Sequence, residues 1–284
     1  MDPTGFAEQV GTTGAVTITG LSTRGGPVAG VRRVIAPSGI ESIQADEMIV
    51  RCGAATGVAE LDAALGEVGQ SIALPLCGTV GGALAVGHSD IRRLGYGPVR
   101  NTLLQARYVS AKGDVVKAGG PTVKNVSGFD LCRLLVGSCG TLGFLGEVIL
   151  RTRPRPATSQ WFARASEEPL AVFAALYRPV SVLWDGATIF VLLEGHPADV
   201  REQAAAARLD EAPGPPQLPV GRSSLSPSAI TSLTGRFVAE VGVGIVHGDA
   251  PRRPPLESGV AAVGARVKHE LDPTGRLNPG VVVG

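Results

Sequence analysis

The chain has 284 residues, an apolar fraction of 44% and a net charge of +1. It can therefore fill the core of one large two-lobed domain or two ordinary ones, and it lacks the clustered Lys and Arg that a nucleic acid or an anionic membrane requires as a partner. No apolar run approaches the ~20 residues of a bilayer span and no signal peptide is evident, so we expect a cytoplasmic protein without a transmembrane segment.

Short strands alternate with one helix in the first third of the sequence. Apolar and β-branched runs predict strands at 15–19, 33–36, 48–52 and 71–74. Residues 20–27 carry three glycines and a proline, which predicts a loop. A helix is expected between Thr56, which can cap it, and Gly69, which can end it, because apolar residues recur there at three- and four-residue steps.

The middle third predicts a hairpin and a long closing strand. Gln105–Ala111 is expected to pair with Asp114–Lys117 across a Lys-Gly turn. Residues 145–153 form an apolar run that two prolines end, so we expect a domain boundary near Arg155.

The last third has the order β-α-β-β-α, which is typical of half a ferredoxin-like domain. The expected elements are a strand at 159–165, a helix at 168–177, strands at 180–184 and 188–193, and a helix at 199–209. Another helix is expected to end near Leu271.

Four cysteines, Cys52, Cys77, Cys132 and Cys139, show no C-x-x-C spacing and lie among apolar or glycine-rich neighbours. We expect buried, inert thiols and no zinc or iron–sulfur ligation, so no metal is predicted.

A glycine-rich segment, Cys77–Gly87, precedes a short apolar helix that Thr79 can cap. Free backbone N–H groups at such a turn attract a pyrophosphate, because no side chain blocks close approach. Taken alone, a plain loop is the commoner explanation of such a segment.

A denser motif runs through Lys124-Asn125-Val126-Ser127-Gly128-Phe129-Asp130 and Gly137-Ser138-Cys139-Gly140-Thr141-Leu142-Gly143 to Glu147-Val148. Together with the Thr79–Ala83 loop and the Arg92–Gly97 stretch, it resembles the FAD-linked oxidases of the PCMH, or vanillyl-alcohol-oxidase, superfamily. The nearest likeness is to the FAD-binding E subunit of bacterial glycolate oxidases. The likeness is strong over residues 16–156 and weak over the tail at 272–280.

The resemblance implies an α+β fold with FAD as the cofactor. It places a PCMH-type two-lobed FAD-binding domain at 1–155, with lobes at about 1–77 and 78–155. A short ferredoxin-like α/β cap domain with a C-terminal tail is expected at 156–284.

The resemblance also implies two sets of FAD contacts in the first hundred residues. The family's first loop, which wraps the pyrophosphate, corresponds to Ser22, Thr23, Arg24, Gly25 and Gly26. Its second loop, which passes the pyrophosphate and flavin, and the segment after it correspond to Gly78, Thr79, Val80, Gly81, Gly82, Ser89, Tyr96 and Gly97.

Further contacts are implied by the denser motif. The block beside the isoalloxazine corresponds to Lys124, Asn125, Gly128 and Asp130. The turn over the adenine side and the strand that ends against the ring correspond to Gly137, Ser138, Gly140, Thr141, Leu142, Gly143 and Val148. Replacing Gly81 or Gly140 by Asp is expected to leave a folded protein without flavin, because the carboxylate would meet the diphosphate.

The sequence departs from the family pattern in two ways. The first loop has no His, so noncovalent FAD is expected. The last third lacks the metal-binding His and Glu cluster that related 2-hydroxy-acid dehydrogenases use. His247 is a weak catalytic candidate there, and a buried structural His is the competing interpretation.

Two functions follow from the resemblance. One is a subunit that oxidises a small 2-hydroxy acid through FAD and passes electrons to a partner. The other is a catalytically inactive flavin-binding or electron-relay subunit of a larger dehydrogenase. The implied partners are a paralogous flavin subunit and a cysteine-rich iron–sulfur subunit, which could also hold the chain peripherally at a membrane. A relation to UDP-N-acetylenolpyruvylglucosamine reductases is disfavoured by the Asn278-Pro279-Gly280 ending.

Overall fold

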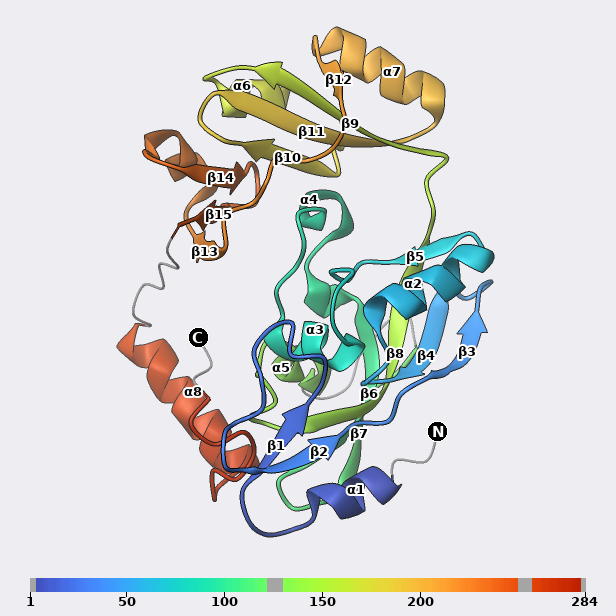
Figure 1. Cartoon of the computed structure of the whole chain (residues 1–284), viewed down its shortest axis with the longest axis vertical. Helices are drawn as coiled ribbons and strands as arrows, with labels where there is room; N and C mark the ends of the chain where they lie inside the picture. The colour runs from blue at the N-terminus through green and yellow to red at the C-terminus, as the bar shows by residue number, and fades with distance from the viewer. Residues whose placement is uncertain (1–3, 122–129, 250–256, 282–284) are drawn as a thin grey trace. The chain divides into compact units, whose positions relative to one another are not determined.

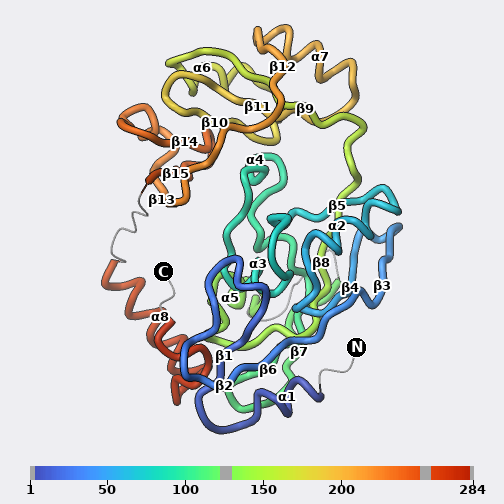
Figure 2. The backbone as a smooth tube through the Cα atoms, in the orientation of Figure 1, coloured from blue at the N-terminus to red at the C-terminus, as the bar shows by residue number. Residues whose placement is uncertain are grey.

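The structure is a computed structural model that describes residues 4–121, 130–249 and 257–281. The chain divides into two compact units, each with its own apolar core. Unit 1 comprises Met1–Asp90, Pro98–Arg155 and Leu256–Gly284, and unit 2 comprises Ile91–Gly97 and Pro156–Pro255. Figures 1 and 2 show the course of the chain through both units.

The main sheet of unit 1 has six antiparallel strands (Figure 1). In spatial order they are β3 (Ile40–Gln44), β4 (Ile49–Gly53), β8 (Phe144–Pro154), β6 (Leu103–Val109) and β7 (Val115–Gly119), with β5 (Gln70–Ile72) paired to β8. The first seven residues of β8 are all buried, because this strand lies between β4 and β6. The predicted hairpin is confirmed, with Val109 paired to Val115 at its turn.

A parallel strand pair and several helices complete unit 1. They are β1 (Val16–Thr19), β2 (Arg32–Ile35), α1 (Thr4–Val10), α2 (Val58–Glu67), α3 (Val80–Val86), α5 (Leu131–Leu135), the short 3-10 helix Val99–Asn101, and α8 (Ser258–Leu271). The predicted cap of α3 is confirmed, since Thr79 Oγ1 accepts a hydrogen bond from the Gly82 N–H at 3.1 Å. The predicted cap of α2 is wrong. Thr56 Oγ1 instead accepts a hydrogen bond from the Gly39 N–H and donates one to the Gly39 carbonyl oxygen. Gly57 is the residue at the N-cap position of α2.

The chain after α8 is anchored to the N-terminal part of unit 1. The Arg276 guanidinium donates to five backbone carbonyls, those of Val10, Gly11, Thr13, Gly14 and Ala111. Burial would raise the pKa of Asp272, but hydrogen bonds from Lys268 and from the Leu277 and Arg276 amides outweigh it and lower that pKa. Thus a tail with a weak sequence likeness is a fixed part of the unit.

Unit 2 is a seven-stranded sheet with two helices on one face. Its strands, in spatial order, are β12 (Asp210–Ala212), β9 (Thr158–Ala165), β11 (Thr188–Gly195), β10 (Ser181–Trp184), β14 (Phe237–Glu240), β15 (Ile245–Gly248) and β13 (Gly221–Ser224). The helices are α6 (Pro169–Ala174) and α7 (Pro197–Ala206), and two short helices, α4 (Arg93–Tyr96) and the 3-10 helix Pro227–Ser232, also belong to this unit.

The predicted β-α-β-β-α order is confirmed by β9, α6, β10, β11 and α7. Strands β12, β13 and β14 were not predicted, because they are three or four residues long and some, such as Gly221–Ser224, are polar. The expected domain limits, 1–155 and 156–284, stay a prediction. The compact units are composed differently, since Leu256–Gly284 packs in unit 1 and Ile91–Gly97 in unit 2.

The thiols differ from the expectation of four buried cysteines. Cys52 and Cys132 are buried, and burial raises their pKa values to about 12 and about 11. Cys77 is exposed, and Cys139 is half-buried in a turn that borders a cavity. Of the helices the structure describes, none is long and apolar enough to cross a membrane.

Candidate functional site

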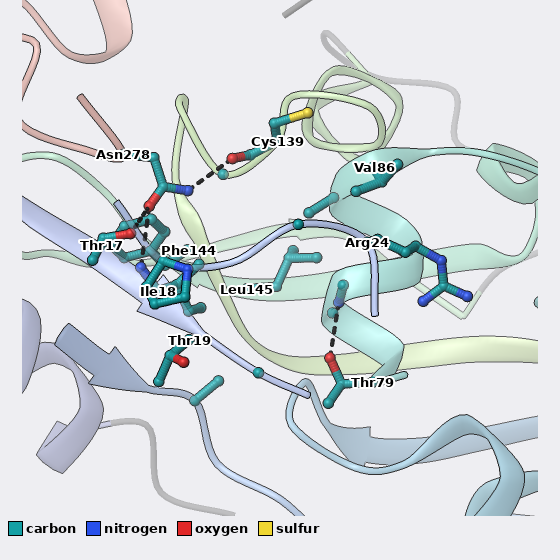
Figure 3. A pocket seen from close by; sticks show the side chains of 18 of the residues that line it. Thr17, Ile18, Thr19, Arg24, Thr79, Val86, Cys139, Phe144, Leu145 and Asn278 are labelled. Carbon is teal, nitrogen blue, oxygen red and sulfur yellow. Dashed lines mark hydrogen bonds between the residues drawn. The ribbon is translucent and has the colours of Figure 1, made fainter. Parts of the chain in front are cut away.

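Three glycine-rich segments of unit 1 meet at one cavity of about 290 Å³. They are the β1–β2 connection, the start of α3, and the turn before β8. The lining residues are 17–28, Ala36, Ala54, Ala55, Thr79, Gly81, Gly82, Ala85, Val86, Leu135, 138–140, 143–145, Asn278 and Val281. Figure 3 shows Asn278 toward one end of this cavity and Arg24 and Thr79 toward the other.

The guanidinium group of Arg24 lies at the cavity and has one nitrogen that donates no hydrogen bond to the described residues. Its Nη2 donates to Cys77 Sγ at 3.1 Å and, more weakly, to Pro75 O at 3.4 Å. Its Nη1 is buried and has no hydrogen-bond partner among the described residues. A buried N–H without an acceptor is costly, so this group calls for an anionic or strongly polar ligand.

Gly78 allows the first two segments to approach each other. Its φ is +70°, in the left-handed region, and an added Cβ would lie 2.7 Å from Arg24 Nη1 and would also collide with Thr23. A side chain at this position would therefore displace the arginine.

Three amides of the second segment, those of Val80, Gly81 and Gly82, are not free, whereas its sequence predicts that they are. The Val80 N–H donates to Thr56 O at 2.9 Å, and the Gly81 N–H donates to Ala54 O at 2.7 Å. The Gly82 N–H donates to Thr79 Oγ1. A Cβ on Gly81 would lie 2.9 Å from the Ala54 backbone oxygen. Glycine at position 81 thus serves close packing of the chain on itself.

The third segment is a rigid turn. Ser138 Oγ donates to Leu135 O, and Thr141 Oγ1 donates to Ser138 O. Gly140 has a φ of +69°, and a Cβ there would lie 2.7 Å from Asn278 Nδ2. The turn therefore needs glycine at position 140 both for its backbone and for the approach of the tail.

Asn278 joins two walls of the cavity through its side-chain amide. Its Oδ1 accepts from Thr17 Oγ1 at 2.8 Å and from the Ile18 N–H at 3.1 Å, and its Nδ2 donates to Cys139 O at 2.8 Å (Figure 3). The sequence did not predict this site residue. The likeness of the tail at 272–280 was the one signal that could have found it.

The remaining wall is apolar. It is made by small or aliphatic residues and one aromatic ring: Ala36, Ala54, Ala55, Ala85, Val86, Leu135, Phe144 and Leu145. Ala85 and Val86 belong to the Cys77–Gly87 segment, but none of these residues was predicted as a contact, because apolar side chains carry no signal of their own for a ligand. An apolar slot joined to a cation with a spare donor fits FAD, which combines flat rings with a charged diphosphate.

The predicted contact residues fall into four groups. Those that line the cavity are Ser22, Thr23, Arg24, Gly25, Gly26, Thr79, Gly81, Gly82, Ser138, Gly140 and Gly143. Those elsewhere in unit 1 are Gly78, Val80, Ser89, Asp130, Gly137, Thr141, Leu142 and Val148, and those in unit 2 are Tyr96 and Gly97. Lys124, Asn125 and Gly128 lie outside the described residues. As contacts to FAD, all of them stay predictions.

Some of the residues outside the cavity have clear structural roles. Val148 is fully buried in the core of unit 1, and Asp130 caps α5. Ser89 Oγ accepts from the Val99 N–H, and the Tyr96 hydroxyl lies 2.7 and 2.9 Å from the two oxygens of Glu194. His247, the weak catalytic candidate, lies in unit 2 with Nε2 2.9 Å from Glu240 Oε1.

The comparisons with known proteins agree with this geometry. A family model described as "FAD binding domain" matches residues 10–119, which include the first two cavity segments. Residues 10–119 thus belong to an FAD-binding domain of the PCMH type. FAD is therefore its cofactor, and the predicted family and fold class are confirmed.

Several curated proteins are similar to this flavin-binding chain. Glycolate oxidase subunit GlcE of Escherichia coli is 36% identical over 126 residues, covering 43% of this chain and 36% of that protein. D-lactate dehydrogenase of Archaeoglobus fulgidus is 38% identical over 117 residues, covering 40% of this chain and 26% of that protein. Glycolate oxidase subunit GlcD of Bacillus subtilis is 40% identical over 82 residues, covering 29% of this chain and 17% of that protein. The chain thus matches at most 36% of the length of these relatives.

Solved structures share the fold of the chain. Two structures of alkyldihydroxyacetonephosphate synthase match 93% and 94% of it with TM-scores of 0.66 and 0.69, at 15% and 14% identity. They are covered over 71% and 72% of their own lengths. At this identity the likeness concerns the fold alone.

Proposed function

We propose that the chain is an FAD-dependent oxidoreductase subunit, similar to those of glycolate oxidase, that oxidises a small 2-hydroxy acid. The observation that carries the proposal is the cavity of the FAD-binding domain, with the unused donor of Arg24 beside an apolar wall. The names of the relatives, glycolate oxidase and D-lactate dehydrogenase, support the substrate class, since glycolate and lactate are both 2-hydroxy acids.

We propose that FAD is held without a covalent bond. The first loop carries no His for a flavin tether. Arg24 would hold the diphosphate by charge-assisted hydrogen bonds, and Gly25 and Gly26 would leave room for it, because neither has a protein atom closer than 3.9 Å to where a Cβ would lie. The alanines and Phe144 would exclude water from the flat rings.

Bound FAD would supply a two-electron acceptor. Asn278 would keep the first loop and the turn at 138–143 in register, so that the shape of the slot does not depend on the ligand. In this way the chain orients the cofactor before any substrate arrives.

We propose that the electrons leave through another protein. Among the residues that the structure describes, no three His, Cys, Asp or Glu side chains are grouped to hold a metal ion. A paralogous flavin subunit and a cysteine-rich iron–sulfur subunit are the partners we propose. A cytoplasmic location, with membrane contact only through these partners, belongs to the same proposal.

Anaerobic flavin reduction tests the proposal. The purified chain is loaded with FAD, and its absorbance is followed after addition of glycolate or D-lactate, with acetate as the control acid that has no hydroxyl group. Bleaching by a hydroxy acid alone is the expected result. If the oxidised spectrum persists, the chain is instead an inactive or electron-relay subunit. Failure of the folded chain to take up any FAD contradicts both functions.

A further inference from the structure

A short stretch of chain after α3 belongs to the other compact unit. Unit 1 is left after Asp90 and resumes at Pro98, and the residues between them, Ile91–Gly97, belong to unit 2. We call Ile91–Gly97 the strap. The Val99 N–H donates to Ser89 Oγ at 3.1 Å, so the chain on the two sides of the strap is joined within unit 1. The strap is therefore fixed to unit 1 at both of its ends.

Backbone and apolar contacts dock the strap on the sheet of unit 2. The Gly95 N–H donates to Val180 O at 3.1 Å, and a Cβ on Gly95 would lie 2.8 Å from Val180 Cα. Glycine at position 95 is thus needed for this close approach. Leu94 packs against the apolar core of the same unit. Helix α4, which forms the middle of the strap, consequently lies on β10.

A hydrogen bond between Tyr96 and Glu194 is the polar anchor of the strap. The Tyr96 hydroxyl lies 2.7 and 2.9 Å from the two carboxylate oxygens of Glu194 on β11. Ser159 Oγ of β9 donates to the same carboxylate at 3.0 Å, and the Arg92 guanidinium lies over the Tyr96 ring, 5.1 Å from its centroid. A hydrogen bond to a carboxylate is stronger than one between neutral groups. We call the hydrogen bond between Tyr96 and Glu194 the latch.

The chain that enters the strap comes directly from two walls of the FAD cavity. Helix α3, whose residue Ala85 lines the cavity, ends at Gly87, shortly before the strap begins. The carbonyl oxygens of Leu84 and Ala85 accept from the N–H groups of Gly137 and Cys139, at 3.0 and 2.8 Å. Those two residues belong to the third glycine-rich segment. A displacement of the end of α3 would therefore move this segment as well.

We propose that the strap couples unit 2 to the FAD cavity, with Tyr96 and Glu194 as positioning residues for the cofactor. The latch holds the strap on the unit 2 sheet, and the strap holds the end of α3 and the turn bonded to it in the conformation that accepts FAD. This role differs from a direct contact of Tyr96 with FAD, because it acts through Glu194. Coupling between two sites is reciprocal, so bound FAD stabilises the latch by the factor by which the latch strengthens FAD binding.

A double-mutant cycle on FAD affinity tests the latch, with fluorescence titration of the full chain as the measurement. Tyr96→Phe removes the hydroxyl and should weaken FAD binding by roughly 3- to 10-fold, the size expected for residues that couple two sites without touching the ligand. Glu194→Leu should have the same effect, and the double variant should bind no more weakly than either single one. Tyr177→Phe, at a tyrosine of the same unit that is 76% exposed, is the matched control and should bind as the wild type does.

Amide hydrogen exchange tests the reciprocal effect. FAD should slow exchange in the peptide that contains the Gly95 N–H several-fold in the wild type, and it should do so much less in Tyr96→Phe. A peptide from α7, in the same unit, is the control and should exchange equally with and without FAD. If Glu194→Leu does not fold, Glu194→Gln keeps one acceptor oxygen for the Tyr96 hydroxyl and should bind FAD with an affinity between those of the wild type and Tyr96→Phe.

Three results would overturn the coupling. The first is an unchanged FAD affinity in the folded Tyr96→Phe protein, even if its Tm is lower, because the latch would then stabilise unit 2 alone. The second is a loss of affinity in Tyr96→Phe that Glu194→Leu does not reproduce, which would indicate direct contact of Tyr96 with FAD. The third is exchange of the strap that FAD leaves unchanged in the wild type. Neither measurement uses a substrate, so the outcome is independent of the proposed oxidation of a 2-hydroxy acid.

Discussion

Gly25 and Gly26 of the first cavity segment have open space around them, whereas Gly81 and Gly140 of the other two are pressed against protein atoms. All four line the same cavity. At the first pair a side chain would enter the space for the ligand, and at the second pair it would collide with the chain itself. Glycine content alone therefore does not tell a ligand contact from a packing constraint.

The largest expected effect belongs to the packed glycines. Gly81→Asp should destabilise the chain by about 3 kcal/mol, because its Cβ would overlap the Ala54 backbone, and such overpacking is not relieved by side-chain rotation. The sequence-based expectation of a folded, colourless variant is thus revised for Gly81, and also for Gly140, where the left-handed backbone and the nearby Asn278 amide disfavour a side chain.

Thermal unfolding of the apo-protein measures this effect, with an expected fall in Tm of roughly 6–12 °C. Gly5→Asp in α1 is the control, since no atom lies within 4 Å of its added Cβ. A Gly81→Asp protein as stable as the wild type would show that the segment can move aside.

The open glycines should affect the ligand instead of the fold. Gly26 is outside the left-handed region, and the atom nearest to an added Cβ is Ser22 Oγ at 3.9 Å. Gly26→Asp should therefore fold normally but bind FAD roughly 30-fold more weakly, a loss of about 2 kcal/mol from carboxylate–diphosphate repulsion. Fluorescence titration with FAD measures the affinity.

Gly214→Asp in unit 2 is the matched control for Gly26→Asp. Its position is also free of neighbours within 4 Å and outside the left-handed region, and it lies in the unit that does not contain the cavity. Equal FAD affinity in both variants would argue against the first loop as the diphosphate site.

Loss of a single donor should have a smaller effect than an added charge. Arg24→Gln removes the unused Nη1 donor and should weaken FAD binding by about tenfold, the low end for a charge-assisted hydrogen bond. Arg33→Gln, at an exposed arginine of β2, should leave the affinity unchanged. An effect of the same size in both variants would reduce the role of Arg24 to long-range attraction.

The smallest effect is expected in the tail that carries Asn278. The folded-state pKa of Asp272 is lowered, so its contribution is present above its unfolded pKa of about 3.9 and is lost as the pH falls through the folded value. Asp272→Asn should therefore lower the stability near neutrality, where this contribution is present, and flatten the acid limb of a stability-against-pH curve, so that the variant and the wild type converge at low pH. Urea unfolding at several pH values checks this, and an acid limb of unchanged slope would contradict it.

Local patterns predicted what depends on neighbours in sequence. The β6–β7 hairpin and the Thr79 cap follow from a short turn and from a residue three positions from its donor. The Thr56 cap failed because Gly39 offered it a tertiary partner instead. The edge strand β13 of the unit 2 sheet was missed because its four residues are too few to show a periodic pattern.

The sequence by itself determined the family, the cofactor and the three glycine-rich segments that line the cavity, because these depend on residue types at fixed local spacing. Only the tertiary structure decided how each segment is used. The Asn278 side chain bonds to Thr17, which lies near the other end of the sequence, and the N–H groups of Val80, Gly81 and Gly82 are bonded within the protein. The contact between Glu240 and His247 arises from the register of β14 and β15. Such contacts depend on how distant segments pair, and local spacing does not encode that.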